Sequence, residues 1–334
     1  MALQETEQLT RMMAAAALPR AICTLGELGV ADHIQSGAPR SAANLASATG
    51  ANEDALYRLM RFTASYGVFR ETANRSFDHT PVSAALRTDA DSSFRPAARM
   101  FHRMFPGWDG LHHAVATGGS SFEKVFGMPM FDHIGQHPEL GPLFDAGMTA
   151  VHGHETAAML EAYDFSDIQT LADIGGGNGS LLTAVLRKYP HLKGFLYDLG
   201  HVAGRANESI RAHGLEARCA VIEGSFFDSI PPGADAYLMR HVIHDWTDEQ
   251  SVQILRNCRK AVPANGRILI VEFHVSPANE PSVGKDADMI MMAYPGGKER
   301  TPEEYGALFE QAGFRLSSVT RTKSAVSVIE GRPA

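Results

Sequence analysis

The segment 169–198, QTLADIGGGNGSLLTAVLRKYPHLKGFLYD, constrains the fold of this chain more than any other. A short apolar run that carries Asp173 is followed at once by four glycines, and then by apolar residues at helical spacing. A second apolar run ends at Asp198. The order predicts strand, glycine turn, helix, strand and acid, which is half of a nucleotide-binding α/β unit.

The spacing of the glycines indicates which nucleotide this turn binds. A dinucleotide turn has the pattern G-x-G-x-x-G, but here Ser180 stands where the third glycine is required. Asp173-x-Gly175-x-Gly177-x-Gly179 resembles instead the acidic glycine loop of S-adenosylmethionine-dependent methyltransferases. That cofactor requires bare backbone, which glycine provides, and an acceptor for the ribose hydroxyls, which Asp198 can supply.

Length, charge and cysteine content narrow the class further. The chain has 334 residues, enough for about two domains, and a formal net charge of −8, which disfavours a nucleic-acid-binding surface over the whole molecule. Cys23, Cys219 and Cys258 are scattered and predict no disulfide framework. The apolar run 12–18 is too short to span a bilayer, so we expect a cytoplasmic protein with no membrane partner.

Residues 1–91 predict a mostly helical domain with the pattern of a winged helix. Helices at 41–48 and from Asn52 precede a hairpin of 68–71 and 75–78. Residues 1–100 hold ten arginines, no lysine and ten acidic residues, so the domain is neutral overall and DNA binding is disfavoured. We therefore expect this domain to form a homodimer rather than to bind nucleic acid.

Residues 92–165 predict a helical linker rich in methionine, aromatic residues and histidine. Each such residue is more often core than pocket, but as a group they suit a planar apolar substrate. The residues expected to line the substrate pocket are Met104, Trp108, Phe144 and Met148. The paired histidines at 152/154 and 241/244 have no carboxylate or cysteine at ligand spacing, so we expect no metal.

Residues 166–334 alternate predicted strands and helices, which indicates a parallel, doubly wound Rossmann-like sheet. Ser225, His244 and Glu272 each follow a predicted strand, where ligands of such sheets bind. The segment 296–300, GGKER, lies just before a predicted helix and is expected at the same crevice. Two further runs near the C-terminus predict a closing hairpin.

Four motifs in this order resemble the plant-type small-molecule O-methyltransferases, which also include bacterial antibiotic-pathway members. They are Asp173–Gly179, Gly224–Phe227 (GSFF), His244–Trp246 (HDW) and Gly296–Arg300 (GGKER). The resemblance covers nearly the whole chain. It implies an α/β methyltransferase domain with a winged-helix-like dimerisation domain, S-adenosylmethionine as cofactor and an aromatic hydroxyl as methyl acceptor.

The resemblance also implies roles for individual residues. His244 is the expected general base, and one or both of Glu299 and Glu272, at the family's flanking positions, are expected to orient it. The residues expected at the cofactor are Gly175, Gly177, Asp198, Leu199, Ser225, Phe226 and Arg240. The family usually has Asp where this chain has Ser225 and often Lys where it has Arg240, which changes the charge or shape of the donor.

Two other enzyme classes compete with this interpretation. A relative with the same fold and cofactor could carry out decarboxylation or hydroxylation, but His244 and Glu299 favour methyl transfer. A nicotinamide-dependent oxidoreductase is disfavoured by Ser180 in the glycine turn.

Overall fold

A computed structural model describes residues 2–276 and 278–334. The chain divides into two compact units. The first comprises the residues up to Phe105 together with Pro142–Val151, and the second comprises Pro106–Gly141 and His152–Ala334. Helix α10 (Leu140–Ala162) contributes to both units.

The first unit has the winged-helix pattern that the sequence predicts. Its elements are α1 (Ala2–Ala15), α2 (Ala17–Leu28), η1 (Val30–His33), β1 (Arg40–Ser41), α3 (Ala42–Thr49), α4 (Glu53–Ser65), β2 (Phe69–Thr72), β3 (Ser76–His79), α5 (Pro81–Ala84) and α6 (Arg95–Met104). The predicted caps are confirmed, because Ser41 and Asn52 accept hydrogen bonds from the first-turn amides of α3 and α4. The hairpin lies about one residue later than predicted, and β1 adds a third strand in the order β1-β3-β2.

Helices α2 and α6 pack closely within this unit because small residues meet between them. A Cβ on Gly26 would lie 2.7 Å from the Cβ of Ala98. In the same way, Gly147 of α10 faces Met100 of α6, whose Sδ would lie 2.6 Å from an added Cβ. Side chains larger than hydrogen at these two positions would force the helices apart.

The second unit begins with short helices, two of which end at a glycine. These elements are η2 (Phe105–Gly110), α7 (Leu111–Thr117), α8 (Ser121–Phe126) and α9 (Met130–Gln136). Gly118 and Gly127, both at φ +77°, end α7 and α8 in the left-handed conformation that favours glycine.

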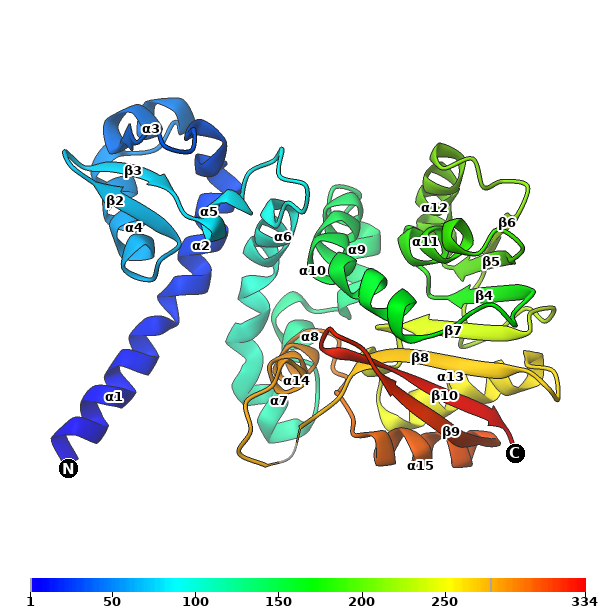
Figure 1. The fold of residues 1–334 in the computed structure, drawn as a ribbon. Coiled ribbons are helices and arrows are strands. Elements are labelled where there is room, and N and C mark those ends of the chain that lie inside the picture. The colour runs from blue at the N-terminus through cyan, green and yellow to red at the C-terminus, as the bar shows by residue number, and fades with distance from the viewer. Residues whose placement is uncertain (1, 277) are drawn as a thin grey trace. The chain divides into compact units, whose positions relative to one another are not determined.

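A seven-stranded sheet forms the centre of the second unit (Figure 1). Its strands are β4 (Thr170–Ile174), β5 (Lys193–Asp198), β6 (Cys219–Glu223), β7 (Ala236–Arg240), β8 (Arg267–Phe273), β9 (Phe314–Arg321) and β10 (Val326–Pro333), in the order β6-β5-β4-β7-β8-β10-β9. The pairs from β6 to β8 are parallel, and β10 is antiparallel to both of its neighbours. The doubly wound sheet and the closing hairpin of the sequence analysis are thus confirmed.

Helices cover both faces of this sheet, and each face has its own core. Helices α11 (Ser180–Lys188) and α12 (Gly200–Ala212) pack on one face, and α13 (Asp248–Ala261) and α15 (Pro302–Ala312) on the other (Figure 1). Strand residues alternate between the two cores, as Leu196 on one side and its neighbours Phe195 and Tyr197 on the other show. The remaining elements are η3 (Ile243–Asp245) and α14 (Val283–Ala293).

None of the helices in the described part of the chain combines the length and the apolar character that a membrane span requires.

Candidate active site

The carboxyl ends of five parallel strands meet at one edge of the sheet. The strand registers pair Ile174 with Tyr197, Asp198 with Glu223 and Arg240 with Val271. The segments that follow these strands therefore lie side by side. They carry most of the predicted site residues: Gly175, Gly177, Asp198, Ser225, Phe226, Arg240, His244 and Glu272.

The glycine turn after β4 adopts a conformation that other residues rarely take. Gly175, Gly177 and Gly179 have φ of +69°, +57° and +76°. The amide of Gly177 donates to Oδ2 of Asp198 (2.9 Å), and the amide of Leu199 donates to Oδ1 of the same carboxylate (2.7 Å). Asp198 thus fixes the turn through both of its carboxylate oxygens.

Two features of this turn fit a bound S-adenosylmethionine. A Cβ on Gly175 would lie 2.8 Å from Cγ2 of Val242, so this position has no room for a side chain. The glycine leaves its backbone accessible to a ligand. Asp173 is 2% exposed, and its Oδ2 has no hydrogen-bond partner among the described residues. Burial raises the pKa of Asp173 to about 7, against the opposing charge of Arg240. Arg240 itself is largely buried and donates to Oγ1 of Thr156 (2.7 Å).

Aromatic side chains stand beside the same turn. The ring centroids of Phe226 and Phe227 lie 5.9 and 4.7 Å from that of Trp246, in edge-to-face contact. The ring of Phe226 lies next to Gly175, since a Cβ added to Gly175 would be 3.6 Å from Cε1 of Phe226. Ser225 accepts a hydrogen bond from the amide of Phe227 (3.2 Å), and Leu199 is 42% exposed. These flat, apolar surfaces can hold an adenine ring.

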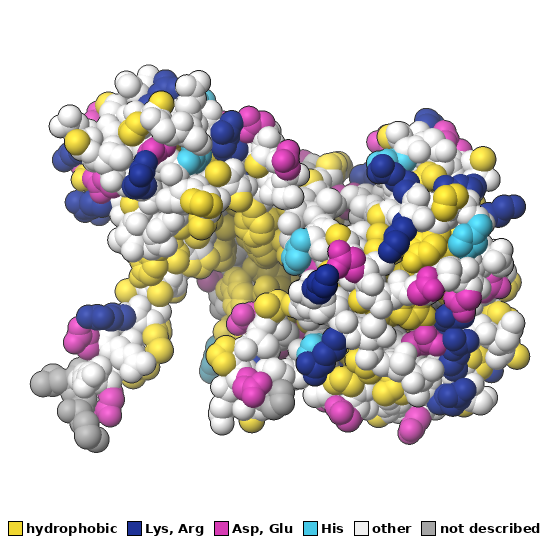
Figure 2. Space-filling view, viewed as in Figure 1, with side chains coloured by type: hydrophobic (Ala, Val, Ile, Leu, Met, Phe, Trp, Pro, Cys, Tyr) yellow, Lys and Arg dark blue, Asp and Glu magenta, His cyan; other side chains and the backbone are white. Residues whose placement is uncertain are grey.

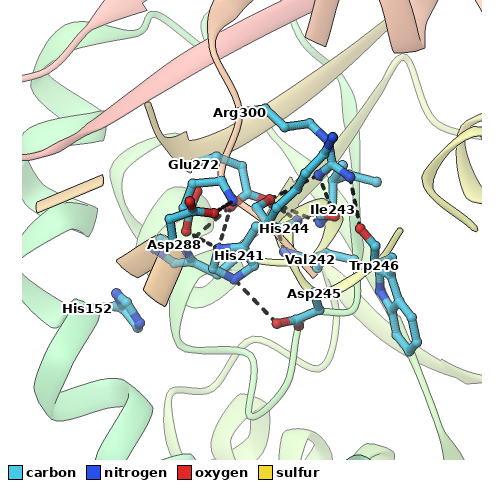
Figure 3. Close-up of polar contacts among 12 residues, drawn as sticks. His152, His241, Val242, Ile243, His244, Asp245, Trp246, Glu272, Asp288 and Arg300 are labelled. Carbon is cyan, nitrogen blue, oxygen red and sulfur yellow. Dashed lines mark hydrogen bonds and ion pairs between the residues drawn. The ribbon is translucent and has the colours of Figure 1, made fainter. Parts of the chain in front are cut away.

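His244 lies in η3 with its ring buried and faces two carboxylates (Figure 3). Its Nδ1 is 2.6 Å from Oε1 of Glu299 and 3.1 Å from Oε2 of Glu272. Its Nε2 is 3.6 Å from Oδ1 of Asp245, beyond hydrogen-bond distance. The structure therefore brings together the three residues that the sequence analysis predicts as catalytic.

Glu272 also holds the backbone of the His244 turn. Its Oε1 accepts from the amides of Val242, Ile243 and His244 at 3.1, 3.0 and 3.3 Å (Figure 3). A buried carboxylate that accepts three amides stabilises a turn whose donors have no other partner.

The GGKER segment clamps the same turn from the other side. A Cβ on Gly297 would lie 1.9 Å from the carbonyl oxygen of His244, which accepts the amide of Lys298 (2.9 Å). The fully buried guanidinium of Arg300 donates to the carbonyls of Ile243 (3.1 Å) and Trp246 (2.8 Å). Glycine at 297 and arginine at 300 therefore fix Glu299 beside the imidazole.

The electrostatics of this cluster favour a charged imidazole. Burial opposes the charged ring, but the carboxylates of Glu272, Glu299 and Asp245 outweigh it and raise the pKa of His244 to about 10. Burial raises the pKa of Glu299, whereas the histidines and the backbone amides hold the pKa of Glu272 below its usual value. Burial also raises the pKa of Asp245 to about 7. The ring can accept a proton at Nε2 only in its neutral form with the proton on Nδ1, and the carboxylates then stabilise the imidazolium that results.

The structure completes two donor clusters that the sequence spacing does not reveal. His152, Glu155 and His241, and likewise His241, His244 and Glu272, each bring three donor atoms within 4.8 Å of one another. Glu155 lies three positions after His152 within α10, whereas Glu272 comes from β8, 28 positions after His244. The sequence argument against a carboxylate near these histidines was therefore wrong. In both clusters the donor atoms already form hydrogen bonds or ion pairs with one another.

The predicted substrate residues fall in both units. Met104 of α6 and Phe144 and Met148 of α10 belong to the first unit, and all three are half-buried. Trp108 of η2 belongs to the second unit, where its ring lies 5.8 Å from that of Tyr294. Their role at the substrate stays a prediction.

Sequence reasoning missed several residues that build the site. Glu155, His152 and His241 form a buried hydrogen-bonded chain, and Arg300 and Asp288 fix the backbone around Glu299. The GGKER motif includes Arg300 but gives it no function. A lone glutamate within a helix gives no pattern that would identify Glu155.

The fold and this site together define a class: an S-adenosylmethionine-dependent methyltransferase with a histidine–glutamate pair at its crevice. Family models for an O-methyltransferase domain and an O-methyltransferase dimerisation domain match residues 108–315 and 10–89. The chain belongs to the O-methyltransferase family, and it is an S-adenosylmethionine-dependent enzyme.

Individual relatives match over almost their full length. Phenazine O-methyltransferase PhzM of Lysobacter antibioticus is 38% identical over 326 residues, 97% of this chain and 95% of the relative. The mitomycin biosynthesis 6-O-methyltransferase of Streptomyces lavendulae is 37% identical, covering 94% of this chain and 91% of its own. The crystal structure of NcsB1 from neocarzinostatin biosynthesis, with S-adenosylmethionine and 2-hydroxy-5-methyl naphthoic acid, has a TM-score of 0.85 at 33% identity and covers 95% of this chain and 96% of that one.

Proposed function

We propose that this enzyme methylates a hydroxyl group of an aromatic small molecule and that His244 is the general base. The observation that carries the proposal is the 2.6 Å contact between Nδ1 of His244 and Oε1 of Glu299. A carboxylate at Nδ1 fixes the tautomer and orientation of the ring and leaves Nε2 as the proton acceptor.

Bound S-adenosylmethionine would supply an electrophilic methyl group. The glycine turn with Gly175 and Gly177, together with Asp198, would hold its amino-acid and ribose ends. Leu199, Ser225 and Phe226 would hold the adenine, and Arg240 would add a positive charge behind the turn. Two requirements remain for the acceptor oxygen. It must lose its proton, and it must lie close to the methyl group and in line with the bond that breaks, because in-line transfer depends on close approach.

His244 meets the first requirement as the hydroxyl proton moves to Nε2. The imidazolium that forms is stabilised by Glu299 and Glu272, which both face Nδ1. The imidazole is buried away from water, so solvent screens its interaction with the two carboxylates only weakly.

The class of acceptor is inferred from the relatives. Their names describe phenazine, mitomycin and naphthoate O-methyltransferases, all of which act in secondary metabolism on fused or aromatic rings. We propose an acceptor of this kind, held in part by Met104, Trp108, Phe144 and Met148.

A panel of phenolic scaffolds, including hydroxyphenazines and hydroxynaphthoates, tests the proposal. Each is incubated with the enzyme and labelled S-adenosylmethionine, and products are identified by mass. Label transfer to at least one hydroxylated aromatic supports the proposal. Decarboxylated or hydroxylated products without label would favour the competing chemistry of the same fold.

We further propose that residues 1–91 form a homodimerisation domain, that 92–165 form the substrate-pocket region and that 166–334 bind the cofactor. Helix α1 exposes Leu9 (64%), Met12 (60%) and Met13 (76%), and apolar side chains run along it in Figure 2. A groove of about 440 Å³ lies between α2 and α4, lined by Ala17, Arg20, Ala21, Thr24, Ala55, Arg58, Leu59 and Phe62. A second copy of the chain would cover these apolar surfaces.

Light scattering on a Met12→Glu/Met13→Glu variant tests the dimer. We expect a mass near twice 36.1 kDa for the wild type and near 36.1 kDa for the variant. A monomeric wild type would refute the dimer. We also propose a cytoplasmic location, because all three cysteines are buried free thiols.

A further inference from the structure

His241 lies between two buried carboxylates, one on each side of its ring. Its Nε2 is 2.8 Å from Oε2 of Glu155, and its Nδ1 is 3.6 Å from Oε2 of Glu272. Figure 3 draws it next to His244, and the two ring centroids are 5.0 Å apart. His241 is therefore hydrogen-bonded to Glu155 and at ion-pair distance, without a hydrogen bond, from the carboxylate that also faces the proposed base.

The backbone of His241 is unusual in a way that supports a function. Its φ is +53°, in the left-handed region that non-glycine residues rarely occupy. The residue directly follows β7, where the chain turns into η3. Uncommon backbone conformations of this kind persist where the surrounding structure fixes them, and they cluster at functional sites.

The buried carboxylates favour a second cation near His244. Glu155, Glu272 and Glu299 are at most 3% exposed, and a buried carboxylate without a compensating charge is costly. Burial and the neighbouring His241 lower the pKa of His152 to about 4, so His152 is neutral. Burial opposes a charge on His241, but Glu155 and Glu272 outweigh it and raise its pKa.

We propose that His241 is a positioning residue whose imidazolium bridges Glu155 and Glu272 and holds Glu272 against the η3 amides and His244. The proposal rests on the proposed function only for its effect on turnover. It assigns no contact with substrate or cofactor to His241. Glu155 and His152 of α10 form the support behind it, since His152 Nδ1 is 3.0 Å from Oε1 of Glu155.

The charged and titratable groups that act on His241 come from four elements. They are His152 and Glu155 of α10, Arg240 at the end of β7, His244 and Asp245 of η3, and Glu272 of β8, with Glu299 beyond His244. Arg240 acts mainly on Asp173, so it does not replace His241 as the partner of Glu272.

The protonation state of His241 can be measured without turnover. Nitrogen-15 NMR of the full-length, histidine-labelled enzyme, with signals assigned by single variants, reports both ring nitrogens. We expect His241 to be an imidazolium at pH 7, with a pKa that falls by about one unit or more in Glu155→Gln. A neutral His241 at pH 7, or an unchanged pKa in Glu155→Gln, would overturn the proposal.

Kinetics then test the positioning role. We expect His241→Asn to lower kcat about tenfold or more while the Kd for S-adenosylmethionine stays within about twofold. The matched control is His191→Asn, since His191 bonds the carbonyl of Ile168 (3.2 Å) at the amino end of β5, and we expect a change in kcat below about threefold. Equal losses in the two variants, or a folded His241→Asn enzyme with normal kcat, would refute the role.

Two further outcomes keep the test decisive. If His241→Asn does not fold, Glu155→Gln and the wild-type NMR titration still decide the charge state. If metal analysis of purified enzyme finds one zinc ion per chain that His241→Asn loses, a metal site replaces the proposed ion pair. A wild type that methylates no acceptor would refute the proposed function but leave the NMR result intact.

Discussion

Nδ1 of His244 lies 2.6 Å from Oε1 of Glu299, although 55 positions separate the two residues. The contact depends on the GGKER segment, because only glycine at 297 lets its backbone reach the carbonyl oxygen of His244. Nδ1 of the imidazole is thereby occupied by a carboxylate. Nε2 is the nitrogen that remains to take the proton from the methyl acceptor's hydroxyl group.

Replacement of His244 by alanine should abolish methyl transfer. We expect kcat to fall at least about 100-fold because no other group accepts the hydroxyl proton. Calorimetry should show a Kd for S-adenosylmethionine within about twofold of the wild type, since His244 is not among the cofactor residues. Near-normal methylation by this variant would remove His244 from the mechanism.

The pH dependence of turnover should reflect the raised pKa of His244. The protonated ring cannot act as a base, so kcat/KM should still rise with pH between 6 and 9 and have its midpoint near the pKa of about 10. Glu299→Gln removes one of the anions that stabilise the imidazolium, so the midpoint should move to lower pH while kcat falls. A midpoint that stays fixed in Glu299→Gln would show that another group controls the profile.

Asp198→Ala should weaken cofactor binding. The carboxylate fixes Gly177 and Leu199 and is the proposed ribose acceptor, so we expect the Kd for S-adenosylmethionine to rise about 10- to 100-fold in calorimetry. Asp164→Ala, which removes an exposed carboxylate bonded to Ser166 away from the turn, is the control and should bind normally. Equal affinity in both variants would place the ribose elsewhere.

Arg300→Met should destabilise the second unit. The guanidinium is fully buried and donates to the carbonyls of Ile243 and Trp246 and to Oδ1 of Asp248, and methionine would remove all of these hydrogen bonds. We expect a loss of about 3–5 kcal/mol in the free energy of unfolding, measured by denaturant titration. Lys298→Met removes an exposed cation that pairs with Asp248 (2.8 Å), which is also a partner of Arg300 (2.9 Å), and should change stability by less than about 1 kcal/mol. Similar losses of unfolding free energy in the two variants would contradict the proposed role of Arg300 in holding the His244 turn.

Local signals in the sequence predicted much of this fold. The capping residues Ser41 and Asn52 mark helix starts that the structure confirms, because capping depends on neighbours within one turn. The glycine turn and Asp198 were predicted for the same reason, since the strand–turn–helix–strand pattern is contiguous.

Long-range contacts could not be predicted in this way. Glu155 reaches His241 across 86 positions, and no spacing rule joins a residue within one helix to the end of a distant strand. The alignment of parallel strands, which sequence periodicity does not specify, decides which side chains meet. The resemblance to a family located His244 and Glu299 but did not identify the buried support behind them.

The most direct measurement uses S-adenosylmethionine labelled with carbon-13 in its methyl group, together with the best acceptor from the phenolic panel. Carbon NMR of the product shows which atom carries the labelled methyl. The proposed function predicts an aryl methyl ether from the wild type and none from His244→Ala. A labelled methyl on nitrogen or carbon, or an ether formed equally well by His244→Ala, would contradict it.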